Sequence, residues 1–219
     1  VSGELHFTGV TPWPVTPLSP GIMGPFAWIP WMECYHGVVS LDHAIHGVLT
    51  VDGTSIDYAR GRGYIEKDWG RSFPAAWVWM QTNHFDQPGT SFTASIAVIP
   101  LLGFSFRGLI VGLWDGSELY RFATYTGANI DALTISDEEV QATISDSDYR
   151  LEIAARRAKG GVLRGPTGLD MRGRVPESLR ATVTVRLSAP GRAGSGLLFE
   201  GTGRSAGLEV VGEVSKLLG

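Results

Sequence analysis

The stretch 63-GYIEKDWGRSFPAAWVWMQTNHF-85 contains two extended segments separated by a sharp turn. Successive side chains of a strand point to opposite faces of a sheet, and the two segments are short and aromatic, which favours strands. The connection runs from Gly70 to Pro74, and both residue types are typical of turns. We therefore predict two consecutive β-strands here.

The same kind of pattern continues on both sides of this stretch. Short segments with alternation or β-branched residues are bounded by Gly, Asp, Asn or Pro, and helical periodicity is scarce. About a dozen strands are expected at a spacing of roughly 8–12 residues. Asp115-Gly116 is a strong hairpin signal. The sequence therefore predicts an all-β fold, built as a barrel or a sandwich.

Two segments are expected to be irregular. Residues 12–30 contain six prolines, which cannot donate to a strand ladder. Residues 159–180 are rich in glycine and carry five basic residues. We interpret the second segment as a long loop. Three roles are open for it: a solvated connection, a lid, or a contact with anionic lipid head groups.

Composition limits the possible functions. The chain has 219 residues, 43% of them hydrophobic and 18% charged, which is enough to bury a core. The net charge of -4 gives no global field that would favour nucleic acid. Cys34 is the one cysteine, so no intrachain disulfide forms. We find no apolar run of membrane-helix length and expect a soluble protein, either cytoplasmic or peripheral to a membrane.

Aromatic and histidine residues gather in the first part of the chain. Six of the seven tryptophans and four of the five histidines precede residue 80. Aromatic rings with polar tips suit a pocket that is both apolar and specific. We therefore place the site in the first half. The alternative is that the tryptophans only fill a core.

The strand at 63–70 has two faces of different chemistry. Tyr64, Glu66 and Asp68 share one face, whereas Ile65, Lys67 and Trp69 share the other. The apolar side chains of the second set favour an arrangement in which the acids are solvated. If the acids point inward instead, burial raises the pKa of a carboxyl group and makes it a proton donor near neutral pH.

The next strand has a mixed aromatic and amide face. Trp77, Trp79, Gln81 and Asn83 share it, with Val78, Met80, Thr82 and His84 on the opposite side. Such a face suits a ligand with an apolar tail and an oxygenated head. The alternative is an ordinary half-buried sheet face.

Metal and cofactor motifs are not found in the sequence. His43 and His46 fall on opposite strand faces, and there is no HxH or HExxH spacing. Cys34 with His36, two residues apart, is not a catalytic signature. The glycines fall in turns rather than in a phosphate loop. We predict no metal and no cofactor.

Three stretches carry a resemblance to a known family: 11-TPWPVTPLSPGIMGPFAWIPWMECYHGVVSLDH-43, the stretch 63–85, and 198-LFEGTGRSAGLEVVG-212. They resemble the tocopherol cyclase family over nearly the whole chain. The resemblance implies a lipocalin-like antiparallel β-barrel or sandwich domain over residues 1–219, with long connecting loops. It also implies a further N-terminal β-domain, most of which we expect this chain to lack.

The resemblance implies a reaction that needs no cofactor. An acid protonates the double bond of a prenylated hydroquinone, and a phenolic oxygen captures the cation to close an ether ring. Aromatic faces stabilise such a cation. The candidates for catalysis are Glu66, Asp68 and His36. The candidates for substrate binding are Glu33, Tyr35, Tyr64, Trp69, Trp77, Trp79, Gln81, Asn83 and His84.

Three functions follow as hypotheses. The first is a cofactor-independent cyclase or isomerase acting on a prenylated or similar hydrophobic substrate. The second is a lipocalin-like carrier of a hydrophobic small molecule. The third, which is weaker, is a hydratase or lyase acting on an isoprenoid double bond. Buried carboxyl groups favour the first and third hypotheses, whereas acids confined to the surface favour the second.

Overall fold

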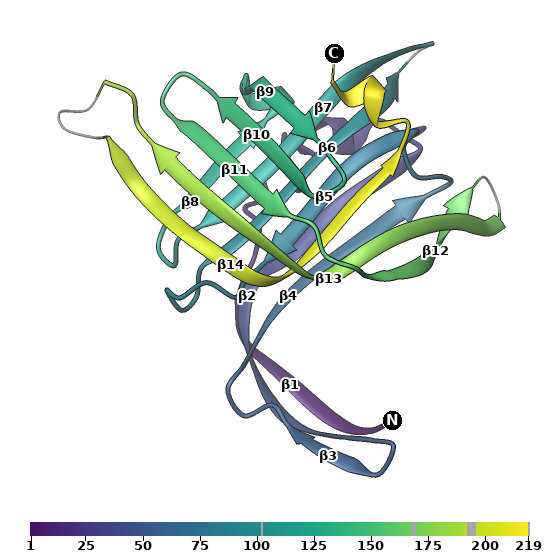
Figure 1. Ribbon diagram of the computed structural model, residues 1–219, viewed down its shortest axis with the longest axis vertical. Helices are drawn as coiled ribbons and strands as arrows, with labels where there is room; N and C mark the ends of the chain where they lie inside the picture. Colours follow the sequence, from purple (N-terminus) through teal and green to yellow (C-terminus); the bar gives the residue numbers. More distant parts are fainter. Residues whose placement is uncertain (102, 168–169, 192–195, 219) are drawn as a thin grey trace.

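Two antiparallel sheets make up the computed structural model, which describes residues 1–101, 103–167, 170–191 and 196–218 (Figure 1). The smaller sheet contains β1 (Ser2–Thr11), β2 (Cys34–Val51), β3 (Thr54–Asp57) and β4 (Gly61–Gly70). The larger sheet has the order β8-β7-β6-β5-β14-β13-β11-β10-β9, with β12 paired to β13. Its strands are β5 (Ala76–Thr82), β6 (Ser91–Leu101), β7 (Phe104–Trp114), β8 (Leu119–Ala123), β9 (Asn129–Ile135), β10 (Glu139–Ser145), β11 (Arg150–Arg156), β12 (Gly161–Thr167), β13 (Asp170–Ser188) and β14 (Leu197–Gly212).

The larger sheet folds back on itself around an aliphatic core. Side chains from β5–β8 meet side chains from β10, β11, β13 and β14 in one cluster, which includes the fully buried Phe92, Phe122, Leu151 and Leu187. The alternation of buried and exposed positions along β10 and β11 fits strands with one face in this core. This interior is filled by side chains.

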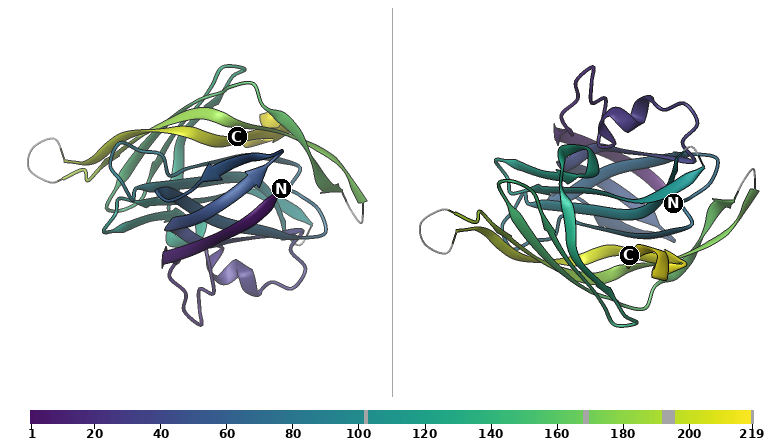
Figure 2. Two further views of the ribbon diagram at one scale, coloured as in Figure 1. Left: turned by 90° about the horizontal axis from the view of Figure 1, so that it is seen from below. Right: turned by 90° about the horizontal axis from the view of Figure 1, so that it is seen from above.

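The smaller sheet and the proline-rich segment cover the outer face of β6 and β7. Trp13, Met23 and Leu41 are buried in this second cluster and pack beside Ile99 and Ile110. The segment is irregular as predicted and includes the short 3-10 helix η1 (Gly24–Trp28). Figure 2 shows the resulting layers, with the smaller sheet and this segment on one side of β5–β7 and strands β9–β11 on the other.

One end of the smaller sheet projects from the body as an arm, formed by β1, β3 and the adjoining ends of β2 and β4 (Figure 1). At its neck, Asp42 and His43 are buried, and the Arg62 guanidinium makes an ion pair with Asp42. The Phe7 ring packs on His43 with the ring centroids 4.9 Å apart. These contacts fix the arm to the body.

The prediction of an irregular loop at residues 159–180 is wrong. The segment forms β12 and the first part of β13, paired from Gly161↔Glu177 to Thr167↔Asp170, and only residues 168–169 of it lie outside the described part. Only one face of this ribbon packs on the body, through Val175. Because most of the other side chains of the hairpin stay exposed, the segment shows little of the alternation that identifies a strand in sequence.

The all-β, antiparallel prediction is confirmed, with no α-helix in the described part of the chain. The helical segments there are 3-10 turns, including η2 (Thr124–Thr126) and η3 (Val214–Leu217), and none has the length and hydrophobicity to cross a bilayer. The Asp115-Gly116 turn joins β7 to β8. Its Asp115 carboxylate accepts hydrogen bonds from the backbone N–H of Ser117 and of Glu118.

Candidate active site

A cavity of about 230 Å³ lies between the smaller sheet and the outer face of β5, β6 and β14. Both sheets contribute side chains to it, so neither sheet alone forms the site. Its lining residues are Met23, Cys34, His36, Glu66, Asp68, Phe73, Pro74, Trp77, Trp79, Ser95, Ala97, Ile99, Ile110, Glu177 and Glu209.

The wall formed by the smaller sheet carries a hydrogen-bonded row of polar groups. His36 on β2 lies directly opposite Asp68 on β4, and its Nδ1 is 2.7 Å from Asp68 Oδ1. Glu66, two residues earlier on β4, lies on the same face, and its Oε2 is 3.8 Å from His36 Nε2. The Tyr64 hydroxyl donates to Glu66. The order along this wall is therefore Asp68, His36, Glu66, Tyr64.

Burial and neighbouring charges shift the pKa values in this row. Burial alone would lower the pKa of His36, but the hydrogen bond that its Nδ1–H donates to Asp68 and the charges of Glu66 and Asp68 outweigh burial and raise the pKa. Burial also raises the pKa of Glu66, against the opposing influence of His36 and Tyr64. The Tyr64 pKa is raised well above its usual value, chiefly by burial, so this hydroxyl stays protonated.

The opposite wall carries Glu209, which the sequence analysis missed. Glu209 on β14 lies opposite Trp79 in the register, and its Oε2 accepts a hydrogen bond of 2.6 Å from Trp77 Nε1. Burial raises the pKa of Glu209 to about 7. Burial also raises the pKa of Glu177, which lines the same cavity. The signal for Glu209 was a single acid in the otherwise apolar run Leu208–Val211.

An apolar annex of about 60 Å³ adjoins the cavity. It lies between the proline-rich segment and β6–β7. The two spaces share five lining residues, Met23, Ser95, Ala97, Ile99 and Ile110. The rest of the annex is almost entirely apolar, with Phe26, Met32 and Phe106 among its walls. The site therefore combines a polar chamber with an apolar extension.

The interpretation in which the acids of β4 are solvated is wrong for Glu66, whereas Asp68 lines the cavity and is exposed. The side chains of Glu66 and His36 are only 17% and 14% exposed and face the cavity. It is Trp69, on the opposite face, that is 46% exposed. The Trp69 ring stacks on Tyr35 at 5.5 Å and lies under the ammonium group of Lys67 at 4.5 Å. The smaller sheet thus directs its apolar face outward and its polar face inward.

Six of the predicted site residues meet at or beside the cavity, and six lie elsewhere. His36, Glu66, Asp68, Trp77 and Trp79 line it, with Tyr64 bonded to Glu66. Cys34, on the same face as His36, also lines it, although it was not among the candidates. Not among the lining residues are Glu33, Tyr35, Trp69, Gln81, Asn83 and His84.

Each of these outlying residues has another setting. The Tyr35 hydroxyl donates to the Ile29 carbonyl at 2.5 Å. The backbone carbonyl of Glu33 accepts from the N–H of Arg71 and of Ser72. His84 is exposed and pairs with Arg204 by an isolated bridge. Strand β5 ends at Thr82, before Asn83, which limits the aromatic and amide face to Trp77, Trp79 and Gln81.

His36, Glu66 and Asp68 each offer one ligand atom to a metal within 4.8 Å of the others. The analysis of spacing along the chain could not see this group, because it forms across two strands. Asp68 and Glu66 lie at different ring nitrogens of His36, and a single ion can bind only one of these nitrogens. The geometry therefore suits a proton relay better than a chelate. Cys34 adds no thiolate, because burial raises its pKa to about 12.

Comparison with known proteins adds three findings. A family model described as tocopherol cyclase-like matches residues 20–212. A probable chloroplastic tocopherol cyclase of Oryza sativa subsp. japonica is 27% identical over 111 residues, which are 47% of this chain and 22% of that protein. A chloroplastic tocopherol cyclase of Zea mays is 27% identical over 112 residues, 48% of this chain and 23% of that protein.

The matched segment spans less than a quarter of the length of each of these two relatives. Among solved structures, kievitone hydratase from Nectria haematococca aligns with a TM-score of 0.46 and 15% identity, over 82% of this chain and 53% of that one. The family match, by contrast, extends over most of the chain. The protein belongs to the tocopherol cyclase-like family.

Proposed function

We propose that the protein is a proton-transfer enzyme, a cofactor-independent cyclase or isomerase acting on a prenylated hydroquinone or a similar hydrophobic substrate. One observation carries the proposal: two buried carboxyl groups, Glu209 and Glu66, belong to opposite walls of one aromatic-lined cavity. Perturbed titratable groups in a cavity are characteristic of catalytic sites. Membership of the tocopherol cyclase-like family supports this class of reaction.

Glu209 is the better candidate for the acid. Its pKa of about 7 keeps a large share of this carboxyl protonated near neutral pH. After proton loss, the N–H of Trp77 stabilises the carboxylate that remains. The sequence candidates for this role, Glu66 and Asp68, lie beside His36, whose raised pKa favours the imidazolium. This positive charge opposes the rise in the pKa of Glu66.

The row on the smaller sheet then serves as the proton acceptor. In the proposed reaction, a proton from Glu209 adds to the double bond, and a tertiary cation forms. The phenolic oxygen attacks the cation, a C–O bond closes the ring, and the phenolic proton passes to Glu66. His36 Nε2 is buried and has no hydrogen-bond partner within the described residues, so it is free to meet a substrate oxygen. Proton exchange with solvent then returns the donor and the acceptor to their starting protonation states.

The remaining parts of the site match the other needs of this chemistry. The rings of Trp77 and Trp79 line the cavity and can stabilise a cation, an interaction worth about 0.5–2 kcal/mol. The apolar annex has room for part of a hydrocarbon chain, while the polar row meets the oxygens of the ring. A substrate with an oxygenated head and an apolar tail fits this division.

The test is turnover of a geranylgeranyl- or phytyl-hydroquinone by wild type and by Glu209→Gln, Glu66→Gln and Asp68→Asn. Loss of a general acid typically costs ~10²–10⁴-fold in rate. We expect chromanol from wild type and losses of this size for Glu209→Gln and Glu66→Gln. Asp68→Asn should lose less, because Asp68 acts through His36.

Three results would redirect the proposal. Full activity of Glu209→Gln with loss in Glu66→Gln would assign the acid to Glu66. A tertiary alcohol in place of chromanol would show hydration of the double bond. Quenching of tryptophan fluorescence by the quinol, with no product from any form, would identify a carrier and contradict the proposed catalysis.

A further inference from the structure

The hairpin formed by β12 and residues 170–176 of β13 projects from the body as a two-stranded ribbon (Figures 1 and 2). The register pairs Val162 with Pro176 and Arg164 with Arg174, so these four side chains lie on one face. Val175, on the other face, is buried. One face of the ribbon therefore packs on the protein and the other is directed outward.

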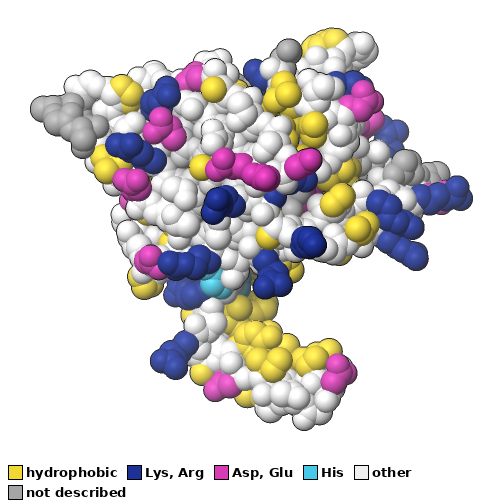
Figure 3. Space-filling view, in the orientation of Figure 1, with side chains coloured by type: hydrophobic (Ala, Val, Ile, Leu, Met, Phe, Trp, Pro, Cys, Tyr) yellow, Lys and Arg dark blue, Asp and Glu magenta, His cyan; other side chains and the backbone are white. Residues whose placement is uncertain are grey.

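The outward face is basic. Between residues 156 and 180 the sequence has seven basic and two acidic residues, although the whole chain has a net charge of -4. Arg164, Arg172 and Arg174 are exposed. Figure 3 shows Lys and Arg side chains gathered over this hairpin. Within the described residues, only Arg172 of these three makes an ion pair, with Asp170 at 3.0 Å. The hairpin thus presents largely unneutralised positive charge.

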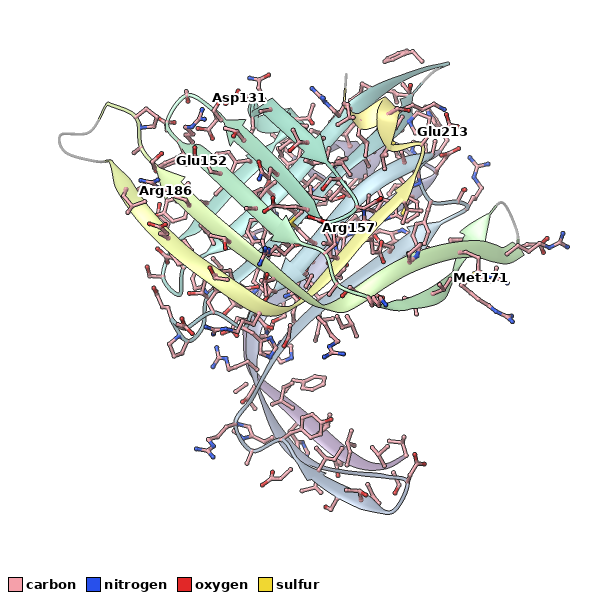
Figure 4. All side chains as sticks on the ribbon, in the orientation of Figure 1. Asp131, Glu152, Arg157, Met171, Arg186 and Glu213 are labelled. Atoms are coloured by element: carbon pink, nitrogen blue, oxygen red, sulfur yellow. The ribbon has the colours of Figure 1, made fainter. Side chains whose placement is uncertain are left out.

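Aliphatic side chains are exposed on both faces of the ribbon: Val162 lies on the face of Arg164, whereas Leu163 and Met171 lie on the face of Val175, toward its projecting part. Val162 is 62% exposed, Leu163 is 50% exposed and Met171 is 56% exposed; Met171 lies toward the outer part of the hairpin (Figure 4). Basic and aliphatic groups together match a membrane interface, where the charges meet head groups and the apolar groups enter the acyl boundary. Residues 159–180 contain no aromatic residue on which a nucleic-acid base could stack.

The base of the hairpin adjoins the cavity described above. Val175 packs with Trp77 and Phe73 in one cluster. A Cβ atom at Gly165 would lie 3.0 Å from the Phe73 ring, so the ribbon and this ring are in close contact. Phe73, Pro74 and Trp77 line both the cavity and the space beneath the hairpin, and Glu177 of β13 reaches the cavity as well. A small molecule that enters from the side of the hairpin therefore first reaches the part of the cavity lined by Phe73 and Trp77.

We infer that the hairpin docks the protein on an anionic lipid bilayer, with Arg164, Arg172 and Arg174 toward the head groups. It thereby holds the Phe73–Trp77 edge of the cavity beside the membrane. The inference that the protein docks on a bilayer depends only on the properties of the hairpin. Its use, which is to pass a hydrophobic substrate from the bilayer into the cavity, rests on the proposed function.

The experiment is sedimentation with phosphatidylcholine vesicles, with and without phosphatidylglycerol, at low and high salt and without substrate. We expect wild type to bind the anionic vesicles and to be released by salt. Each basic residue near an anionic surface contributes about fivefold in binding. Arg164→Glu with Arg174→Glu should therefore weaken binding more than about tenfold. Leu163→Ser with Met171→Ser should weaken it less.

The matched control is Arg60→Glu with Arg186→Glu, which changes the net charge equally at exposed positions outside the hairpin. Circular dichroism and urea unfolding confirm that each variant is folded. Equal losses in the two double arginine variants would overturn the inference, because general charge would then explain binding. Equal binding to neutral vesicles, or no binding to either kind, would also overturn it. Vesicle binding is measured in the absence of substrate. Its outcome is therefore independent of whether the protein catalyses the proposed reaction.

Discussion

The two faces of the β5–β6 strand pair differ in almost every respect. On the inner face, Val78, Met80, Phe92 and Ile96 are buried in an aliphatic core. On the outer face, Trp77, Trp79 and Ser95 line a cavity that also contains carboxyl groups and an imidazole. The strands separate a layer that stabilises the fold from a layer that can perform chemistry. Substitutions one residue apart should therefore have different consequences.

The largest expected effect tests the inner face. Phe92→Ala removes a fully buried ring and should lower the free energy of unfolding by about 3–5 kcal/mol. Trp79→Phe, on the outer face, keeps an aromatic ring at the cavity wall and should lower it by less than ~1.5 kcal/mol while changing turnover. Urea unfolding measures both. Similar losses of stability in the two variants would contradict the separation of the layers.

The second prediction concerns the dependence of stability on pH. Glu209 has a pKa of about 7 in the folded chain against an ordinary value of 4.5. The folded protein therefore holds this proton more tightly than the unfolded chain does. The stabilisation that results is complete below about pH 4.5 and is lost as the pH rises through about 7. Glu209→Gln removes this dependence.

At pH 8 Glu209→Gln should be more stable than wild type by about 1–3 kcal/mol, after allowance for the partial exposure of Glu209. The two proteins should become similar in stability near pH 4. Glu200→Gln, at an exposed glutamate on the same strand, serves as the control. If Glu209→Gln gave no gain at pH 8, the carboxyl would not be desolvated, and its proposed role as acid would lose support.

The smallest expected effect concerns Cys34, which lines the cavity but takes no part in the proposed reaction. Its pKa of about 12 leaves almost no thiolate at pH 8. Iodoacetamide should react with it ~10²–10³-fold more slowly than with a free thiol. Cys34→Ala should retain activity within about twofold. Rapid alkylation of the folded protein, or a large loss of activity in the variant, would give the thiol a role that the geometry does not suggest.

Local patterns predicted the strands well where one face is buried. The predicted hairpin turn at Asp115-Gly116 agrees with the structure, in which it joins β7 to β8. The hairpin at 161–176 was mistaken for a loop because its exposed face removes the alternation on which the prediction depends.

The site was predicted only in part, for a physical reason. His36, Glu66 and Asp68 come from neighbouring strands of the first half, where aromatic and polar residues are concentrated. Glu209 is separated from its partner Trp77 by 132 residues and reaches it through the pairing of β14 with β5. Local alternation carries no information about which distant strands pair. The prediction of a site confined to the first half was therefore incomplete.

The arm and the cavity wall that carries His36 and Glu66 are formed by opposite ends of the same two strands. Strand β2 runs without interruption for 18 residues, roughly 60 Å, from the cavity to the end of the arm, and β4 accompanies it for part of the way. The register shifts between Val38 and His43 mark the point where β2 bends. A small rotation of the strand at this bend produces a larger displacement at the tip of the arm. Conversely, a force on the arm acts on the same backbone that places His36 beside Asp68.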